Sequence, residues 1–288
     1  MDVVIIFNGL GNQMSQYAFM LAKQKKNSAI PLFRADNDCT HNGSELDVLF
    51  GVNYPKGLKK KILDFLYESV QMKRRKKLLN LLGVHFYKEP LNYDYVAEYT
   101  QRKRWGINFY WGGWHTEKYF VNMKDEIVSV FQFPKDNEPE FQKWVQCIKV
   151  ANNSVSLHVR RGDYVNIPET SYYQFGGVAT TEYYNRAIGE MKAKYPDCHF
   201  YVFSNDIAWC KENFGSNEFS YVDCNSGKKS WRDLYLMTLC KHHIIANSTF
   251  SWWGAWLSSQ KDGITLHPKW FIRDVETKDF YPETWKEI

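Results

Sequence analysis

Two adjacent arginines stand at the end of a predicted strand in SVSLHVRRGDY, residues 154–164. Apolar residues occupy alternate positions from Val155 to Val159, as in a strand, and Arg160, Arg161 and a Gly-Asp turn follow. Forked guanidinium donors suit an oxyanion with several oxygens, such as a phosphate or a diphosphate. A structural ion pair with a nearby carboxylate is the alternative, and the arginine pair alone leaves both interpretations open.

Two later strand patterns also end in polar residues. CHFYVFSND (198–206) finishes in Ser204, Asn205 and Asp206, which are good helix caps, and a helix pattern follows. HIIANSTF (243–250) is a short strand pattern that leads into a tryptophan-rich helix pattern. Alternating strands and helices predict parallel sheets, in which ligands bind at the carboxyl ends of the strands. We therefore expect the three polar clusters to converge on one site.

Length and composition bound the possible architectures. The chain has 288 residues, of which 44% are hydrophobic and 17% aromatic, enough for a sizeable core and about two domains. An apolar strand at 3–7, a helix pattern and a second strand at 30–33 predict a β-α-β unit at the start of the chain.

The glycines of this first unit favour a ligand loop over a dinucleotide fingerprint. Gly9 and Gly11 match part of that fingerprint, but Met14 occupies the position of the third glycine, where its side chain would obstruct close packing. NAD(P) binding is therefore disfavoured. A tight loop that brings the amides of Asn12 and Gln13 to a ligand at the helix start is one interpretation, and a plain glycine turn is the other.

The net charge of +5 arises largely from residues 56–83, where apolar residues lie between two blocks of Lys and Arg. Such a segment suits an anionic membrane surface or a partner, and the alternative is an ordinary helical pair with a solvated basic face. Nucleic-acid binding is disfavoured because no recognised module accompanies the charge.

The six cysteines are scattered without a CxxC pair, no secretory leader precedes the first strand, and no apolar run is long enough to span a membrane. We expect a cytoplasmic protein without disulfides, with peripheral contact at the inner face of the membrane as an open alternative. Asp36-Asn37-Asp38 is a DxD match far from the other polar clusters, and His242 and His243 lack partners at metal spacing, so we expect no metal.

Five segments, taken in order, resemble the α-1,2-fucosyltransferases and in particular the bacterial members, which form glycosyltransferase family 11. They are GLGNQM (9–14), GGWHTEKYF (112–120), HVRRGDY (158–164), FSND (203–206) and NSTFSWWGAWL (247–257). The resemblance extends from the first strand to about residue 268. The last segment is long and specific, whereas FSND alone would mean little.

This resemblance implies a GT-B architecture, in which two Rossmann-like domains with parallel sheets face a cleft. It places an acceptor-side domain at 1–150, a domain for the donor GDP-fucose at 151–268, and a tail at 269–288 that packs back on the first domain. The implied reaction is metal-independent, inverting transfer of L-fucose from GDP-β-L-fucose to the 2-hydroxyl of a terminal galactose on an oligosaccharide or lipid-linked glycan. No cofactor is needed beyond the donor substrate.

The resemblance also assigns residues. Arg160 and Arg161 would bind the diphosphate, and Arg160 would also act in catalysis. The remaining donor ligands that it implies are Asn12, Gln13, His158, Asp206, Asn247, Ser248, Thr249 and Ser251.

An inverting displacement needs a group that takes the proton of the acceptor hydroxyl. Asp163, Glu169 and His115 are the candidates, and we favour Asp163, whose alternative role is to hold the two arginines in place. Trp114 is a further candidate at the acceptor edge, with core packing as its alternative. Ser15 replaces the family's usual aromatic after GLGNQM.

Residues 40–110 match no pattern that we can assign, so acceptor choice is expected to reside there. Two other function classes remain open: a catalytically silent glycan- or nucleotide-binding module, and a peripheral protein built around 56–83. Within enzymes, the alternative is a fucosyltransferase of another linkage.

Overall fold

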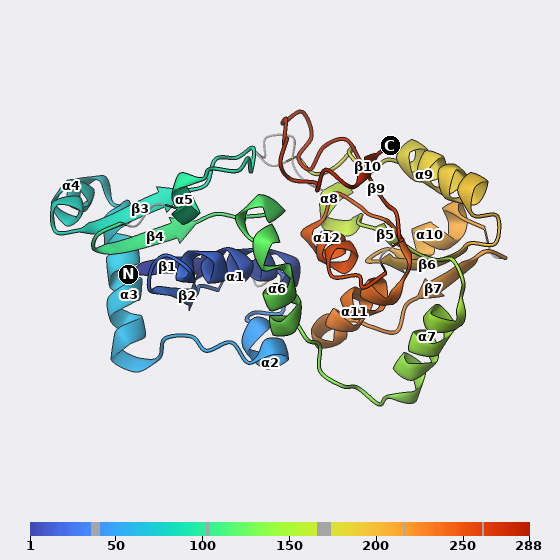
Figure 1. The fold of residues 1–288 in the computed structure, drawn as a ribbon, viewed down its shortest axis with the longest axis horizontal. Helices are drawn as coiled ribbons and strands as arrows, with labels where there is room; N and C mark the ends of the chain where they lie inside the picture. The colour runs from blue at the N-terminus through green and yellow to red at the C-terminus, as the bar shows by residue number, and fades with distance from the viewer. Residues whose placement is uncertain (36–40, 102–103, 166–173, 216, 261) are drawn as a thin grey trace. The chain divides into compact units, whose positions relative to one another are not determined.

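The computed structural model describes residues 1–35, 41–101, 104–165, 174–215, 217–260 and 262–288, without the side chain of Asp163 (Figure 1). The chain divides into two compact units. Unit 1 comprises Met1–Pro134 and Lys278–Phe280, and unit 2 comprises Lys135–Thr277 and Tyr281–Ile288. Each unit is built on its own parallel sheet, as the sequence predicted.

The sheet of unit 1 has the strand order β2-β1-β4-β3, and all its pairs are parallel. These strands are β1 (Asp2–Ile6), β2 (Ala29–Phe33), β3 (Val84–Lys88) and β4 (Ile107–Trp111). The helices are α1 (Leu10–Gln24), α2 (Leu46–Phe50), α3 (Gly57–Gln71), α4 (Lys73–Leu81), α5 (Glu98–Gln101) and α6 (Lys124–Val130), with short 3-10 turns at Glu117–Tyr119 and Val121–Met123.

Alternate strand residues of unit 1 bury opposite faces of the sheet. Phe109 belongs to the core cluster that contains Leu63 and Tyr67 of α3. The next residue, Tyr110, instead contacts the ring of Phe19 on α1 with centroids 5.9 Å apart. The sheet is therefore covered on both faces, as a parallel sheet requires.

The sheet of unit 2 has the order β10-β9-β8-β5-β6-β7, again with parallel pairs. Its strands are β5 (Ser154–Val159), β6 (His199–Ser204), β7 (Phe219–Val222), β8 (His242–Ile244), β9 (Thr265–His267) and β10 (Lys286–Glu287). Its helices are α7 (Pro139–Val150), α8 (Gly162–Val165), α9 (Thr181–Lys194), α10 (Ile207–Asn213), α11 (Trp231–Leu239) and α12 (Thr249–Trp256), with a 3-10 turn at Gly227–Lys229.

The pattern of β6 shows how this second sheet is buried. Phe200 and Val202 pack in the cluster formed with α9 and α10. Tyr201 and Phe203 pack in the cluster formed with α7 and α11. Each of these four residues is less than a tenth exposed.

The division between the units falls after Pro134, whereas the family resemblance implied a boundary at residue 150. Helix α7 belongs to unit 2 because Phe141 contacts the rings of Trp231 and Tyr235 on α11. Of the expected tail, Lys278–Phe280 groups with unit 1, and Tyr281–Ile288 groups with unit 2.

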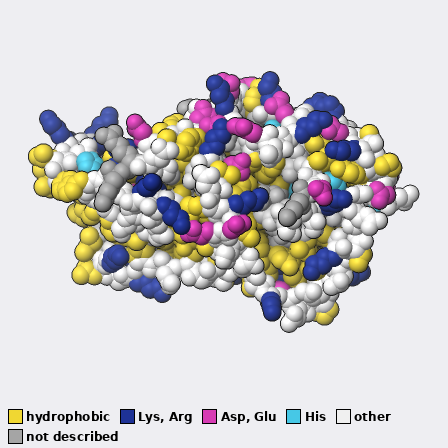
Figure 2. Space-filling view, viewed as in Figure 1, with side chains coloured by type: hydrophobic (Ala, Val, Ile, Leu, Met, Phe, Trp, Pro, Cys, Tyr) yellow, Lys and Arg dark blue, Asp and Glu magenta, His cyan; other side chains and the backbone are white. Residues whose placement is uncertain are grey.

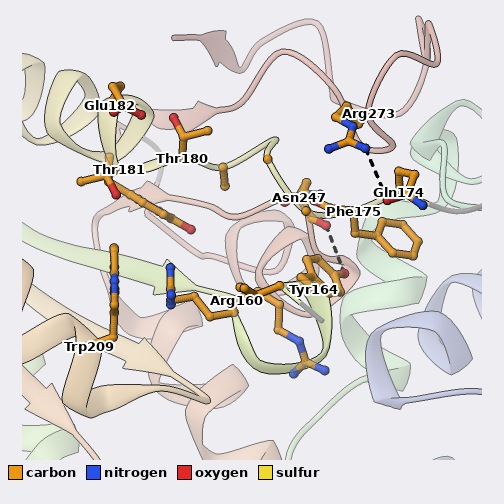
Figure 3. Close-up of a pocket in the computed structure, with 16 residues that line it drawn as sticks. Arg160, Tyr164, Gln174, Phe175, Thr180, Thr181, Glu182, Trp209, Asn247 and Arg273 are labelled. Atoms are coloured by element: carbon orange, nitrogen blue, oxygen red, sulfur yellow. Dashed lines mark hydrogen bonds between the residues drawn. The ribbon is translucent and has the colours of Figure 1, made fainter. Parts of the chain in front are cut away.

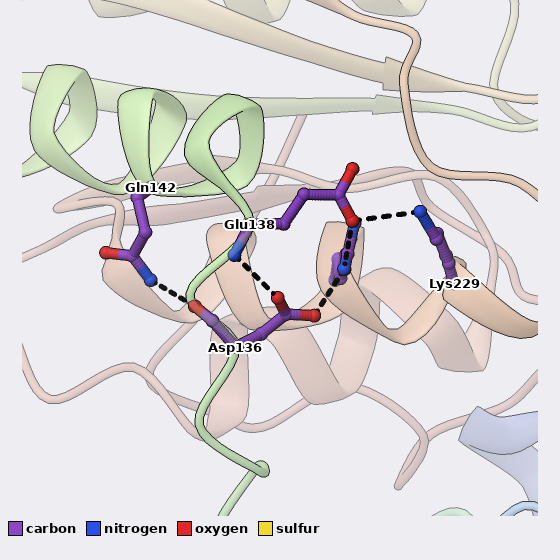
Figure 4. A network of polar contacts seen from close by, with 5 residues as sticks. Asp136, Glu138, Gln142 and Lys229 are labelled. Carbon is purple, nitrogen blue, oxygen red and sulfur yellow. Dashed lines mark hydrogen bonds and ion pairs between the residues drawn. The ribbon is translucent and has the colours of Figure 1, made fainter.

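A polar network secures the start of unit 2 (Figure 4). Arg232 on α11 donates through Nε to Asp136 at 2.9 Å and through Nη2 to Glu138 at 2.7 Å. The Arg232 side chain is 6% exposed, and its guanidinium lies 5.1 Å from the centroid of Phe141. Lys229 also donates to Glu138, at 2.9 Å. The segment that opens unit 2 is thereby tied to α11 before α7 begins.

Candidate functional site

Unit 2 contains a pocket of about 460 Å³ at the carboxyl ends of its central strands (Figure 3). Its walls come from the residues after β5, from α10 after β6, from the residue Asn247 after β8, and from segments before α9 and after β9. The lining residues are Arg160, Arg161, Tyr164, Val165, Gln174, Phe175, Gly176, Gly177, Ala179, Thr180, Thr181, Glu182, Tyr184, Trp209, Asn247 and Arg273.

Arg161 is oriented by three contacts on one side. Its backbone N–H donates to Asn205 at 2.9 Å, its Nε donates to Asp206 at 3.2 Å, and its guanidinium carbon lies 4.2 Å from the ring centroid of Trp209. Among the side chains that the structure describes, none bonds to its two terminal nitrogens. These two donors, held in a fixed plane, suit a bidentate oxyanion.

Arg160 stands beside an aromatic wall. Its guanidinium carbon lies 5.6 Å from the ring centroid of Tyr164. Tyr164 stacks on Phe175 with centroids 4.9 Å apart, and Phe175 also contacts Phe271 at 5.4 Å. Trp209 and Phe175 lie on opposite sides of the pocket in Figure 3. The pocket thus combines cations with two aromatic surfaces on which a planar base could stack.

A glycine pair lets a loop close one wall of the pocket. A β-carbon on Gly176 would lie 2.5 Å from the backbone oxygen of Tyr164, and Gly177 adopts a φ of +73°. A side chain is therefore excluded at Gly176 by space and disfavoured at Gly177 by backbone conformation. The loop then reaches Thr180, which caps α9 by accepting from the backbone N–H of Tyr183 at 3.3 Å. The positive end of the α9 dipole consequently faces the pocket.

Arg273 adds a third cation from the segment after β9. Its Nη2 donates to Gln174 at 3.5 Å, and its backbone N–H donates to the Gln174 carbonyl at 2.7 Å. Both residues are labelled at one end of the pocket in Figure 3. The three arginines therefore give the pocket a strongly positive character that matches a di-anionic or tri-anionic ligand.

Unit 1 carries a second polar site where β3 and β4 end. Glu89 is 5% exposed, and its Oε2 accepts the backbone N–H of Trp114 at 2.7 Å. Trp114 itself adopts a φ of +54°, an uncommon conformation for a residue with a side chain. Burial, opposed by the N–H groups of Trp114 and Gly113, raises the pKa of Glu89 to about 8. Among the described residues, none bonds to its Oε1.

A model of the family described as glycosyl transferase family 11 matches residues 59–288. The chain belongs to glycosyltransferase family 11. It is 34% identical over 302 aligned positions to an α-1,2-colitosyltransferase of Escherichia coli, an alignment that covers 100% of this chain and 99% of that protein. It is also 31% identical to the O-antigen biosynthesis glycosyltransferase WbnK of Escherichia coli, across 94% of this chain and 95% of WbnK.

Solved structures show the fold of this family 11 chain. The NodZ α-1,6-fucosyltransferase soaked with GDP-fucose superposes with a TM-score of 0.52 at 12% sequence identity, over 89% of this chain and 91% of NodZ. POFUT1 in complex with GDP-fucose gives a TM-score of 0.52 at 12% identity, over 92% and 97%. These neighbours are GT-B proteins, so the predicted α/β GT-B class is confirmed.

The structure brings only some of the predicted donor ligands of this family 11 protein into the pocket. Arg160, Arg161 and Asn247 line it. Asp206 lies behind the lining, where it holds Arg161 and caps α10 through the N–H of Trp209 at 3.2 Å. Asn247 is 1% exposed, and its amide donates to two backbone oxygens, those of Phe175 and Phe271 at 3.0 and 2.9 Å. It therefore braces two walls of the pocket.

His158 and the hydroxyls of the last motif lie outside the pocket lining. His158 is 5% exposed with its ring 5.8 Å from Phe250, and burial together with the charge of Arg160 lowers its pKa to about 3. Ser248 caps α12 by accepting the N–H of Phe250 at 3.3 Å. Ser251 donates to the Ser248 carbonyl at 3.4 Å, and Thr249 is the first residue of α12.

The predicted ligands of unit 1 occupy two different environments. Asn12 lies half-buried in the first turn of α1. Gln13 is fully buried, and its amide donates to the backbone oxygens of Asn8 and Gly43 at 2.7 and 2.8 Å while accepting the N–H of Glu45 at 3.0 Å. The contacts of Gln13 are those of a structural brace, because both of its donor hydrogens are already used.

His115 is buried in unit 1 between aromatic rings. It is 4% exposed, with ring centroids 5.0 Å from Tyr93 and 5.7 Å from Phe280. Burial lowers its pKa to about 3. Trp114 is fully buried, and its ring stacks on Phe19 with centroids 4.1 Å apart. This contact matches the alternative role of Trp114 in core packing.

Several predictions fall outside the described part of the chain. Asp163 stands in α8, but its side chain is outside the description, as are Glu169 and the Asp36-Asn37-Asp38 match. Elsewhere in the described ranges, no group of three His, Cys, Asp or Glu side chains is arranged to hold a metal ion. His243 bonds instead to Ser156 at 2.8 Å, and His242 stacks on Tyr195 at 4.2 Å.

Sequence reasoning missed Trp209, the Gly176-Gly177 loop, Arg273 and Glu89. Trp209 carried a usable signal, since it lies three residues after the predicted cap Asp206 and so in the first helical turn. Arg273 carried none, because it lies in a segment without a strand or helix pattern and reaches the pocket through tertiary structure alone.

Proposed function

We propose that this family 11 glycosyltransferase transfers L-fucose from GDP-β-L-fucose to the 2-hydroxyl of a terminal galactose and forms an α-1,2 linkage with inversion. The observation that carries the proposal is the pocket in which Arg160, Arg161 and Arg273 surround a space bounded by Trp209 and Phe175. Its cations suit a diphosphate and its aromatic surfaces suit a nucleoside. The relatives of this chain include the galactoside α-(1,2)-fucosyltransferase 2 of gorilla, which is 31% identical over 49% of this chain.

The chemistry of the proposed step explains why arginines are needed. The galactose 2-oxygen forms a bond to the fucose anomeric carbon while the bond from that carbon to the diphosphate oxygen breaks. The bonding electrons leave with GDP, so negative charge develops on the diphosphate. Guanidinium donors fixed in advance stabilise this charge more in the transition state than in the ground state. We propose Arg160 and Arg161 for this role, with Arg273 as a further contact.

The proton of the acceptor hydroxyl needs an acceptor of its own. We propose Asp163, which follows the arginines directly in α8. The His115 alternative fits less well, because a ring held neutral by burial between Tyr93 and Phe280 has little access to a hydroxyl. Asp163→Asn should lower kcat by at least 100-fold with GDP affinity retained, and near wild-type turnover would remove Asp163 from this role.

Metal independence is part of the proposal. Three guanidiniums can neutralise the departing diphosphate as a divalent ion would. Activity should therefore survive EDTA, whereas a complete loss that Mn²⁺ or Mg²⁺ restores would direct attention to Asp36 and Asp38.

A second candidate donor sugar is colitose, which the 34% identity to an α-1,2-colitosyltransferase supports. Colitose is the 3-deoxy form of fucose, so both donors would use the same contacts to the nucleotide. Selection between them would depend on a polar partner for the fucose 3-hydroxyl, because a site built to bond a hydroxyl rejects the analogue that lacks it.

The deciding experiment is incubation with GDP-fucose or GDP-colitose and a panel of galactosides, with product linkage assigned by NMR. Fucose joined in α configuration to the galactose 2-oxygen is the expected product. A different linkage would support another fucosyltransferase specificity, and colitose transfer alone would support the second candidate. A protein that binds GDP without turnover of either donor on the panel would contradict the proposal.

A further inference from the structure

Helices α3 and α4 of unit 1 expose an unusual number of large apolar side chains. Among the described residues, most of the exposed large hydrophobic side chains lie on these two helices or beside them. They are Leu58, Ile62, Phe65, Met72, Leu78, Leu81, Leu82 and Trp105, each between 49% and 79% exposed. Figure 2 shows hydrophobic side chains along this edge of unit 1, with Lys and Arg side chains next to them. We call this set, with the Lys and Arg residues of 56–77, the α3–α4 surface.

Helix α3 is apolar on two separate faces. Leu63, Tyr67 and Val70 recur at intervals of four and three residues and are buried in the core of unit 1. Leu58, Ile62 and Phe65 recur at the same intervals on another face and are exposed. A helix that packs on one core needs a single apolar stripe, so the second stripe is unexplained by folding.

Helix α4 has no buried residue at all. Its sequence KRRKKLLNL places like charges three and four residues apart, which disfavours an isolated helix. Within the described residues, no acidic side chain pairs with Lys73–Lys77. The two acidic residues of α3 are engaged elsewhere, since Asp64 accepts from Arg34 and Lys60, and Glu68 accepts from Arg34.

The apolar and basic side chains lie on elements that contact one another. A β-carbon on Gly83 would collide with the Trp105 ring, so this ring covers Gly83 directly after Leu81 and Leu82. Arg75 on α4 donates to Ser69 on α3 at 3.2 Å, which holds the two helices together. Residues 56–82 contain nine Lys and Arg and two acidic residues, a net charge of +7 that exceeds the +5 of the whole chain.

We propose that the α3–α4 surface binds the anionic surface of a lipid bilayer, with its helices lying in the interface. Lys and Arg heads would contact lipid phosphates, while Leu, Phe and Trp side chains would enter the boundary between headgroups and acyl chains. None of the helices in the described ranges is long and apolar enough to cross a bilayer, and this mode of binding needs none. The proposal depends on α3 and α4 and is independent of the proposed donor and acceptor.

The combination of side chains favours lipid over other anionic partners. Nucleic acid would use the cations but would leave the exposed leucines in water, since its surface offers phosphates and stacked bases. An acidic protein would pair with the cations, but an exposed row of aliphatic side chains beside them also calls for an apolar partner surface. A bilayer takes up both the charge and the aliphatic side chains, and Trp105 is the residue type that lies at such interfaces.

The test is sedimentation of the full-length protein with vesicles. Wild type should bind vesicles of equal parts phosphatidylcholine and phosphatidylglycerol, should not bind pure phosphatidylcholine, and should dissociate in about 0.5 M salt. Lys73→Gln, Arg74→Gln, Lys76→Gln and Lys77→Gln together should weaken binding on the order of 100-fold or more. The matched control is the same substitution at four exposed lysines of unit 2, Lys135, Lys143, Lys149 and Lys228, which should bind as wild type.

A second variant separates lipid insertion from simple charge attraction. Leu78→Ser, Leu81→Ser and Trp105→Ser together should weaken binding by at least about tenfold, because their apolar area leaves the interface. The apolar control is Val48→Ser with Val150→Ser, whose side chains are both 77% exposed in wild type. This control should bind vesicles as wild type does. All variants should keep the far-UV circular dichroism spectrum and the urea unfolding midpoint of wild type, which shows that they fold. Three results would overturn the proposal: no binding to phosphatidylglycerol vesicles, equal losses in the lysine control, or binding to single-stranded RNA in place of vesicles.

Discussion

Arg161 illustrates how one side chain is prepared for a ligand before the ligand arrives. Asp206 accepts from its Nε, and the Trp209 ring centroid lies 4.2 Å from its guanidinium carbon. Fixing the plane of the guanidinium in advance reduces the entropy lost when an oxyanion binds. The orientation of Arg161 in the pocket lining therefore depends on Asp206 and Trp209.

Arg161→Ala is expected to weaken GDP binding roughly 10- to 100-fold, since a hydrogen bond to a charged group contributes about 1.5 to 3 kcal/mol. Isothermal titration calorimetry measures this loss. Arg186→Ala, at an exposed position on α9 away from the pocket, is the control and should bind GDP as wild type does. Unchanged GDP affinity in both Arg160→Ala and Arg161→Ala would count against the diphosphate assignment.

Glu89 is a buried residue of unit 1 whose protonation is tied to folding. In the folded protein the pKa of this carboxyl is about 8, whereas in the unfolded chain it is near the ordinary value of 4.5. The folded state therefore binds more protons between these two values. The contribution of Glu89 to the free energy of unfolding is therefore fully present at low pH and is lost as the pH rises towards 8.

Glu89→Gln keeps an oxygen for the N–H groups of Gly113 and Trp114 but cannot ionise. From pH 5 to pH 8 the unfolding free energy of the variant should rise relative to wild type by on the order of 3 kcal/mol. Buried histidines contribute equally to both proteins, so the difference isolates Glu89. Urea unfolding at each pH measures it, with exposed Glu140→Gln as the control. A difference that stays constant with pH would show that Glu89 is ionised in the folded state.

At the scale of elements, the loop before α9 is what shapes the pocket wall. Gly176 passes so close to the Tyr164 carbonyl that no side chain fits between them. Gly189, within α9, has open space around its Cα and no such constraint. Substitution by alanine should therefore have opposite effects on stability at these two glycines.

Gly176→Ala should displace the loop from Tyr164, lower stability by about 1 to 3 kcal/mol and weaken GDP binding. Gly189→Ala should instead raise stability by about 0.5 to 1 kcal/mol and leave GDP binding unchanged, because alanine is the better helix residue. Thermal unfolding and calorimetry measure both effects. A Gly176→Ala protein that binds and unfolds like wild type would mean that the loop plays no part in the site.

At the scale of the whole molecule, each unit has its own sheet and its own buried clusters. The contacts of Arg232 with Asp136 and Glu138 fasten the opening segment of unit 2 to α11. Because Arg232 is buried and Lys229 is exposed, the two cations should contribute unequally although both reach Glu138.

Arg232→Met keeps much of the side-chain volume but leaves Asp136 without its main partner. Hydrogen exchange in residues 135–150 and 231–239 should become faster, whereas exchange in unit 1 should stay unchanged. Lys229→Met should be nearly neutral, as expected for an exposed ion pair. Equal loss of protection in both units would show that they unfold as one cooperative body.

The sequence alone determined the local elements and the family. Alternation in 154–159 predicted β5, the apolar run that begins at residue 198 predicted β6, and the cap Asp206 predicted the start of α10, because these signals depend on neighbours along the chain. Arg160 and Arg161 were located at a strand end for the same reason.

Tertiary structure alone decided which polar residues share a space. It brought Arg273, 112 positions after Arg161, into the same pocket, and it committed Gln13 to backbone partners. It also left α4 without a fully buried residue. Such outcomes depend on contacts between segments far apart in sequence, and local patterns carry no information about how those segments pack.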